Sequence, residues 1–169
     1  VTQPVLGARV SYVSMKPYTL SVDIDVPRDL VIELFDDPDN LAMWQGGLVS
    51  WTLREGNQGQ PGAIADIVFQ HGKQRIEMTE EITKRDLPDA FNGTYTWGGN
   101  SNTVNNRFIE VGPDKTRWEL ECQYTMNTFM MKAMALLCAR KFKQQHRLFM
   151  LAFRAFCEDG VDIRTGERG

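Results

Sequence analysis

The sequence predicts an α+β fold in which a curved antiparallel sheet of about seven strands wraps around one long C-terminal helix. Three observations lead to this prediction: an alternating apolar segment at 18–26, several alternating segments separated by turns up to residue 127, and a stretch at 129–159 without glycine or proline. The sheet has one apolar face to bury, and only the long helix is large enough to cover it. Such an arrangement encloses a cavity, which two short helices after the first strand close at one end.

The length of 169 residues fits one domain, so we expect residues 1–169 to form a single unit. Its core is predicted over 18–159, followed by a polar tail over 160–169. A chain of this length buries roughly 70% of its unfolded surface, which allows both a packed core and an internal cavity.

The first strand is predicted where "YTLSVDIDV", residues 18–26, alternates strictly between apolar and polar side chains. Pro27 ends this strand and suits the first turn of a helix over "RDLVIELFDD". A second short helix is predicted over "DNLAMW", residues 39–44, and the glycine pair at 46 and 47 ends it.

Six further strands are predicted between residues 48 and 127, separated by glycine-, proline- and asparagine-rich turns. The strand over 63–72 is too uniformly apolar for its two faces to be told apart. In four of the others the alternation predicts which side chains face the interior: Val49, Trp51 and Leu53; Ile76, Met78, Glu80 and Ile82; Phe91, Tyr95 and Trp97; Trp118, Leu120, Cys122, Tyr124 and Met126.

The long helix is predicted over 129–159, with Asn127 or Thr128 as its N-cap and Gly160 just beyond its end. At 100° per residue, one face collects the apolar side chains and the opposite face collects basic ones. The apolar stripe contains Met131, Met134, Ala135, Cys138, Phe142, Phe149, Ala152, Phe153 and Phe156.

Composition excludes several classes of function. The formal net charge of −3 removes the general attraction to nucleic acid, so we expect no nucleic-acid partner. Three scattered cysteines are typical of a reducing cytosol, and we expect a cytoplasmic protein. The first residues lack the features of a signal peptide, and no uncharged run reaches membrane-spanning length, so no stable membrane insertion is expected. The two histidines lie far apart, which predicts no metal site and no cofactor.

Two segments resemble the START-like helix-grip superfamily, also called SRPBCC. "VDIDVPRDLVIELFDDPDNLAMWQGGL", residues 22–48, is similar to the family's opening, and "DKTRWELECQYTMN" with the long helix is similar to its close. The resemblance covers residues 18–159. The superfamily includes polyketide cyclases and aromatases, sterol and lipid transfer domains, pollen allergens and a co-chaperone branch. The resemblance therefore implies an internal cavity for a hydrophobic small molecule without specifying its chemistry.

The stretch "REGNQGQPGA", residues 54–63, has glycine at 56, 59 and 62. A phosphate-binding loop needs a lysine and a following helix, whereas this stretch lacks the lysine and leads into a strand. We predict a hairpin turn. In the family that the chain resembles, a hairpin at this position lies near the mouth of the cavity, so it is a candidate gate.

Three residues are candidates for acid–base chemistry. Glu80 shares a predicted inward face, and burial there favours a neutral carboxyl group that works as a general acid or base. The alternative is that strand twist turns Glu80 toward an edge or an arginine. His146 and Gln145 lie within about 60° of the apolar axis of the helix, where they reach either a ligand or solvent. Tyr124 points inward, and its hydroxyl needs a partner from the protein or from a ligand.

The predicted ligand-contacting set combines these polar groups with the large inward-facing apolar side chains, for which core packing is the alternative role. It consists of Trp51, Met78, Glu80, Tyr95, Trp97, Trp118, Tyr124, Phe142, Gln145, His146 and Phe149. Leu136, Leu137 and Leu151 fall outside the core stripe, so they mark either a homodimer contact or a surface that the N-terminal segment covers.

Three functions fit these features. The first is a carrier or sensor that binds a lipid, a polyketide-like compound or an isoprenoid. The second is a cofactor-free enzyme of the polyketide cyclase or aromatase kind, in which Glu80, Tyr124 or His146 moves protons. The third is a co-chaperone-like interaction module, which a collapsed cavity and an apolar surface patch would favour.

Overall fold

The computed structural model describes residues 11–126 and 129–168, and the side chains of 11–126 and 139–166. In this part of the chain, eight antiparallel strands form one sheet in the order β3-β4-β5-β6-β7-β8, with β2 and the short β1 both paired along the free edge of β8. The strands are β1 (Val13–Ser14), β2 (Tyr18–Ile24), β3 (Leu48–Glu55), β4 (Ile64–His71), β5 (Gln74–Asp86), β6 (Ala90–Trp97), β7 (Asn100–Gly112) and β8 (Lys115–Met126).

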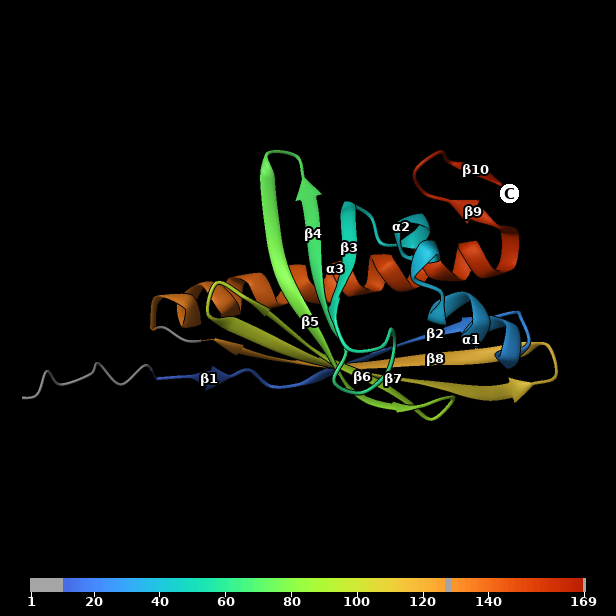
Figure 1. Ribbon diagram of the computed structural model, residues 1–169, viewed down its shortest axis with the longest axis horizontal. Coiled ribbons are helices and arrows are strands. Elements are labelled where there is room, and N and C mark those ends of the chain that lie inside the picture. The colour runs from blue at the N-terminus through green and yellow to red at the C-terminus, as the bar shows by residue number, and fades with distance from the viewer. Residues whose placement is uncertain (1–10, 127–128, 169) are drawn as a thin grey trace, which may run out of the picture.

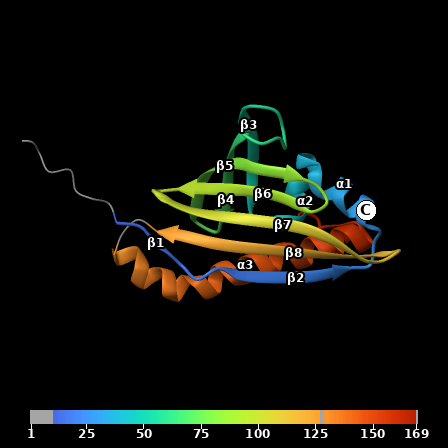
Figure 2. The ribbon, with the colours of Figure 1, turned by 90° about the horizontal axis from the view of Figure 1, so that it is seen from below.

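The helices lie on one side of this sheet. The long helix α3 (Phe129–Asp159) runs along the concave face, and α1 (Arg28–Asp36), a 3-10 turn (Pro38–Asn40) and α2 (Leu41–Trp44) lie at one end of it. Figure 1 shows β3, β4 and β5 rising beside α3 while β2, β7 and β8 run along its length. Figure 2, from below, shows the sheet covering the helix. The predicted sheet wrapped around a C-terminal helix is confirmed.

The turns follow from the sequence. Trp97 and Asn100 pair directly, so β6 and β7 are joined by the two residues Gly98 and Gly99 alone. Both have positive φ, 50° and 78°. A two-residue hairpin that follows the right-handed twist of the strands requires such values, and glycine adopts them without strain. The hairpin therefore fixes the register of the two strands that carry Tyr95 and Asn102.

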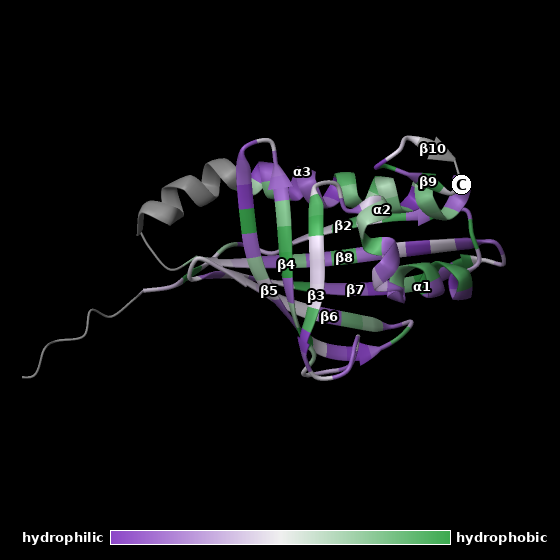
Figure 3. Cartoon of the chain, turned by 45° about the horizontal axis from the view of Figure 1, so that its top comes forward, coloured by the Kyte–Doolittle hydropathy of each residue, from purple (hydrophilic) through white to green (hydrophobic). Residues whose placement is uncertain are grey.

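Alternation along the strands places the apolar side chains on the concave face. Figure 3 shows hydrophobic and hydrophilic bands alternating along β5, whereas β4 has a longer hydrophobic stretch. On β8 the predicted inward face is confirmed, because Trp118, Leu120, Cys122, Tyr124 and Met126 are all buried. The sequence left the phase of β4 open, and its buried residues are Ala65, Ile67 and Phe69, in phase with the buried Ala63 just before the strand.

A packed aromatic cluster fills the end of the fold next to α1 and α2. Phe35, Trp44, Trp118 and Phe153 meet with ring centroids 5.0–6.0 Å apart, mostly in edge-to-face or tilted contacts. Phe153 is fully buried there. The cluster fills this part of the interior, and Phe35, Trp44 and Trp118 also line the space next to it.

One prediction about local structure is wrong. Val49 does not share the inward face with Trp51, because a register shift between Leu48 and Ser50 leaves Val49 57% exposed. The predicted polar tail after residue 159 has regular structure within it. It forms a hairpin of β9 (Val161–Asp162) and β10 (Glu167–Arg168), and the backbone N–H of Ile163 donates to the carbonyl of Met43 near the end of α2.

Candidate functional site

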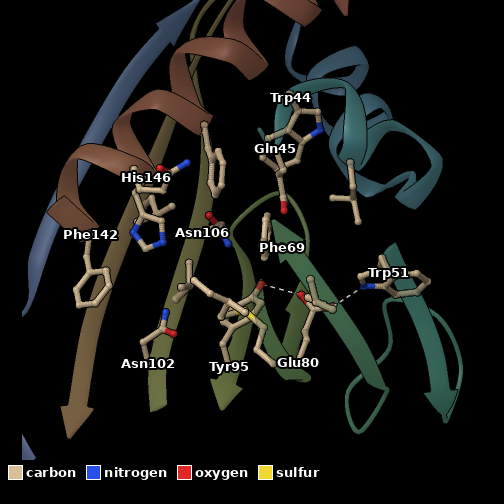
Figure 4. A pocket seen from close by; sticks show the side chains of 18 of the residues that line it. Trp44, Gln45, Trp51, Phe69, Glu80, Tyr95, Asn102, Asn106, Phe142 and His146 are labelled. Atoms are coloured by element: carbon tan, nitrogen blue, oxygen red, sulfur yellow. Dashed lines mark hydrogen bonds between the residues drawn. The ribbon is translucent and has the colours of Figure 1, made fainter. Parts of the chain in front are cut away.

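A cavity of about 220 Å³ lies between the concave face of the sheet, the middle of α3 and the residues around α2. In Figure 4, α3 supplies Phe142 and His146 from one side, α2 and the residue after it supply Trp44 and Gln45, and the strands supply the opposite wall. Most of the lining side chains are aromatic or aliphatic, with a small number of polar groups among them. This composition is typical of small-molecule binding sites.

The structure brings all eleven residues of the predicted ligand-contacting set onto the wall of this cavity, including Glu80, Tyr124 and His146. Sequence reasoning missed twelve further lining residues. These are Phe35, Leu41, Trp44, Gln45, Ile67, Phe69, His71, Ile76, Asn102, Val104, Asn106 and Leu120.

Some of the missed residues carried a signal in the sequence. Asn102, Val104, Asn106 and Phe108 recur every second residue along β7, and all are buried. Because two of these four inward-facing residues are asparagines, the sequence did not show an apolar face here. Asn106 bridges two neighbouring strands, since it accepts from Trp118 Nε1 at 3.0 Å and donates to the carbonyl of Phe91 at 3.0 Å. Its amide is therefore held by the protein before any ligand arrives.

Glu80 lies at the junction between the main cavity and a smaller compartment of about 80 Å³. Tyr95, its direct partner on β6, donates its hydroxyl to Oε1 at 2.7 Å. Trp51 on β3 donates its indole N–H to Oε2 at 2.9 Å. Ala65, the partner of Glu80 on β4, is small enough to leave room for the indole between the strands. The partners of this carboxylate are therefore two neutral donors rather than an arginine.

His146 forms a second polar position, on α3. Its Nδ1 lies 2.8 Å from the hydroxyl of Tyr18, and its ring lies against that of Tyr124, with centroids 6.4 Å apart. Burial lowers the pKa of His146 from its ordinary value of 6.5 to about 4. The imidazole is therefore neutral near neutral pH, where it exchanges hydrogen bonds but is a weak base.

The tyrosine hydroxyls of the site stay protonated. Burial, followed by the neighbouring Cys122 and Tyr18, raises the pKa of Tyr124 far above its usual range. Burial and then the charge of Glu80 raise the pKa of Tyr95 as well. Tyr124 stacks on Phe142 at 4.7 Å, which fixes the plane of its ring. These groups can orient a polar part of a guest, but they do not supply a phenolate.

The glycine stretch borders the smaller compartment. Gln58 and Gly59, in the loop between β3 and β4, line it together with residues of α1 and β5. Arg85 on β5 forms a bidentate ion pair with Asp36 at the end of α1 and also donates to the carbonyl of Gly59 at 3.4 Å. We name this three-way contact of Asp36, Arg85 and Gly59 the latch. It connects the loop to the helix across the compartment.

The described residues contain no cluster of three histidine, cysteine, aspartate or glutamate side chains placed to hold a metal ion. No helix in that same part of the chain has the length and hydropathy to cross a membrane. Of the three leucines predicted at a homodimer contact, Leu151 is exposed, and the side chains of Leu136 and Leu137 lie outside the described residues. The homodimer remains a prediction.

Comparison with family models gives no match, and comparison with curated proteins gives none either. Solved structures do match. Ara h 8.0201 is 13% identical, with a TM-score of 0.66 over 84% of this chain and 97% of its own. The Zhui aromatase/cyclase from Streptomyces sp. R1128 is 11% identical, with a TM-score of 0.71 over 84% of this chain and 93% of its own.

A truncated norcoclaurine synthase from Thalictrum flavum is 16% identical, with a TM-score of 0.67 over 88% of this chain and 96% of its own. At these identities the likeness shows the fold and not the activity. The match covers nearly the whole of each of these proteins. The chain therefore has the helix-grip fold that these solved structures share.

Proposed function

We propose that the protein binds a hydrophobic small molecule in the internal cavity and acts as a carrier or sensor in the cytoplasm. The observation that carries this proposal is the cavity itself, which is bounded by aromatic and aliphatic side chains and holds few polar groups. Several of these polar groups, among them Glu80, Asn106 and His146, are held by protein partners, so they are preorganised to orient a guest.

The magnitude of apolar burial is sufficient for useful affinity. Burying roughly 300 Å² of apolar ligand surface contributes about 7 kcal/mol, at about 25 cal/mol per Å². Part of this offsets the loss of translational and rotational freedom on binding. A fully apolar guest would therefore bind weakly, and contacts with groups such as Glu80 or His146 would supply the remaining affinity and the specificity.

A fluorescence titration with the neutral apolar dye N-phenylnaphthylamine tests the proposal. Val104 lines the cavity on β7, whereas Val111 on the same strand is 41% exposed. Val104→Phe should fill part of the cavity and weaken dye binding about 10-fold or more, whereas Val111→Phe should bind like the unchanged protein. Equal binding by all three proteins would place the dye elsewhere and contradict the proposal.

The second candidate function, a cofactor-free cyclase, is favoured by the carboxylate of Glu80 inside the cavity. Two of the similar structures, the aromatase/cyclase and norcoclaurine synthase, have names that describe enzymes. The low pKa of His146 and the raised pKa of Tyr124 leave Glu80 as the strongest candidate base. Turnover of a linear poly-ketone that is lost in Glu80→Gln would establish the enzyme, and binding without turnover would establish the carrier.

A collapsed interior together with an apolar surface patch would favour the interaction-module hypothesis. The interior instead holds a cavity of about 220 Å³, which does not favour that third candidate.

A further inference from the structure

The charges around the cavity are unbalanced. Among the described residues, Glu80 is the one carboxylate on the wall of the main cavity, and no lysine or arginine lines that wall. The smaller compartment adds a second carboxylate, Asp36, but the bidentate ion pair with Arg85 balances its charge. The negative charge of Glu80 is therefore stabilised by neutral donors alone, Tyr95 and Trp51.

The two histidines of the wall do not supply the missing positive charge inside it. His146 is neutral at physiological pH because burial lowers its pKa to about 4, and one of its nitrogens is shared with Tyr18. His71 lies at the exposed end of β4, where its ring stacks on Phe69 with centroids 6.1 Å apart. None of the described side chains therefore supplies a cation within reach of Glu80, and the guest is the candidate source.

Glu80 also has acceptor capacity to spare. Each carboxylate oxygen has two lone pairs, and each accepts one hydrogen bond in the structure, from Tyr95 or from Trp51. Figure 4 shows the carboxylate of Glu80 between Tyr95 and Trp51, and it lies at the junction of the two compartments. An ammonium group there would donate a charge-assisted hydrogen bond to the free acceptor positions of the carboxylate.

We propose that the guest is an apolar molecule with an amine head, which donates to Glu80 as an ammonium ion, and that the cavity discriminates against apolar carboxylates. This inference rests on the proposed function, since it names the chemistry of a guest in the same cavity. A fatty-acid-like head would place a second negative charge beside Glu80 without a counter-ion, and such a contact gives specificity through repulsion.

Three probes with one apolar skeleton test this inference: naphthylethylamine, naphthylethanol and naphthylacetate, each titrated calorimetrically near neutral pH. The expected order of affinity is amine, alcohol, carboxylate, with the amine at least about 10-fold tighter than the carboxylate. Glu80→Gln should remove the advantage of the amine and leave the alcohol within about 3-fold. Glu81→Gln is the matched control, because the neighbouring exposed carboxylate on β5 carries the same charge and should leave the order unchanged.

Two outcomes overturn this inference and leave the proposed function standing. In the first, the carboxylate binds as tightly as the amine; in the second, Glu80→Gln keeps the same order of affinities for the three probes. The order in the unchanged protein needs no variant, so a poorly folded Glu80→Gln does not prevent a decision. If none of the three probes binds and N-phenylnaphthylamine does not bind either, the proposed function fails together with the inference. If the neutral dye and the alcohol bind while the amine shows no advantage, the proposed function stands and only the choice of head group is wrong.

Discussion

At the scale of single residues, His146 shows most clearly how folding changes the pKa of a side chain. Its pKa falls from 6.5 to about 4 on burial, so the unfolded chain binds this proton more readily than the folded one. The stability that the neutral imidazole contributes is complete above pH 6.5 and is lost as the pH falls toward about 4. The loss is at most about 3.5 kcal/mol, at about 1.4 kcal/mol per pKa unit.

Urea unfolding at several pH values between these limits measures this loss. His146→Gln keeps a polar partner for Tyr18 but does not titrate, so its unfolding free energy should fall less on acidification than that of the unchanged protein. His71→Gln, at an exposed position, serves as the control and should follow the unchanged protein. Parallel pH curves for His146→Gln and the unchanged protein would mean that His146 is not held neutral by the fold.

At this scale the sequence predicts which way a side chain faces, but not what it meets. Alternation along 75–83 was enough to place Glu80 inside, because the side-chain period of a strand is two. Its partners Tyr95 and Trp51 lie 15 and 29 residues away, on strands whose register the sequence left open. The partner of His146, Tyr18, is 128 residues away and was equally out of reach.

At the scale of elements, α3 is held to the sheet by the aromatic cluster around Phe153. The side chain of Phe153 is fully buried against Phe35, Trp44 and Trp118. Phe153→Ala should therefore destabilise the protein by about 3–5 kcal/mol, through lost burial and the cavity left behind. Leu148→Ala, on the same helix but 52% exposed, should change stability by less than about 0.5 kcal/mol. Denaturant unfolding of both variants tests this, and equal effects would contradict the packing.

The latch gives a prediction about ligand exchange. Arg85→Gln removes the ion pair to Asp36 and the contact with Gly59, which join α1, β5 and the loop between β3 and β4. Losing hydrogen bonds of about 1 kcal/mol should raise the dissociation rate of bound N-phenylnaphthylamine about 3- to 10-fold. Stopped-flow displacement measures that rate.

Arg107→Gln is the control for the latch, because Arg107 pairs with Glu119 between β7 and β8 and its side chain is largely exposed. Its dissociation rate should stay at the unchanged value. If both variants release the dye at that value, the glycine loop is a turn and does not gate the cavity.

The elements themselves were largely predictable, and the exceptions have physical causes. The alternating segments and the helix without glycine or proline specify seven strands and α3, because one face of each must be apolar. β1 and the hairpin β9–β10 were missed, since strands of two residues are too short to show a period. The inward face of β3 was misplaced at Val49 because a register shift changes the phase without a signature in the sequence.

At the scale of the whole molecule, the fold predicts that a cavity exists, and the structure supplies its shape. The aromatic cluster around Phe153 fills part of the interior near α1 and α2, while the cavity lies between the sheet and the middle of α3. Sequence alone could not separate these two regions, because Trp118 contributes to the aromatic cluster and to the cavity wall alike. Whether a side chain packs in the aromatic cluster or lines the cavity depends on the curvature of the sheet. No single residue determines that curvature.

Native mass spectrometry of freshly purified protein tests the central claim most directly. We expect the protein to carry a stoichiometric apolar guest, or to take up one N-phenylnaphthylamine per chain, and Val104→Phe to lose this adduct while Val111→Phe keeps it. A protein that carries nothing, takes up no dye, and behaves identically in both variants would contradict an interior built to hold a guest.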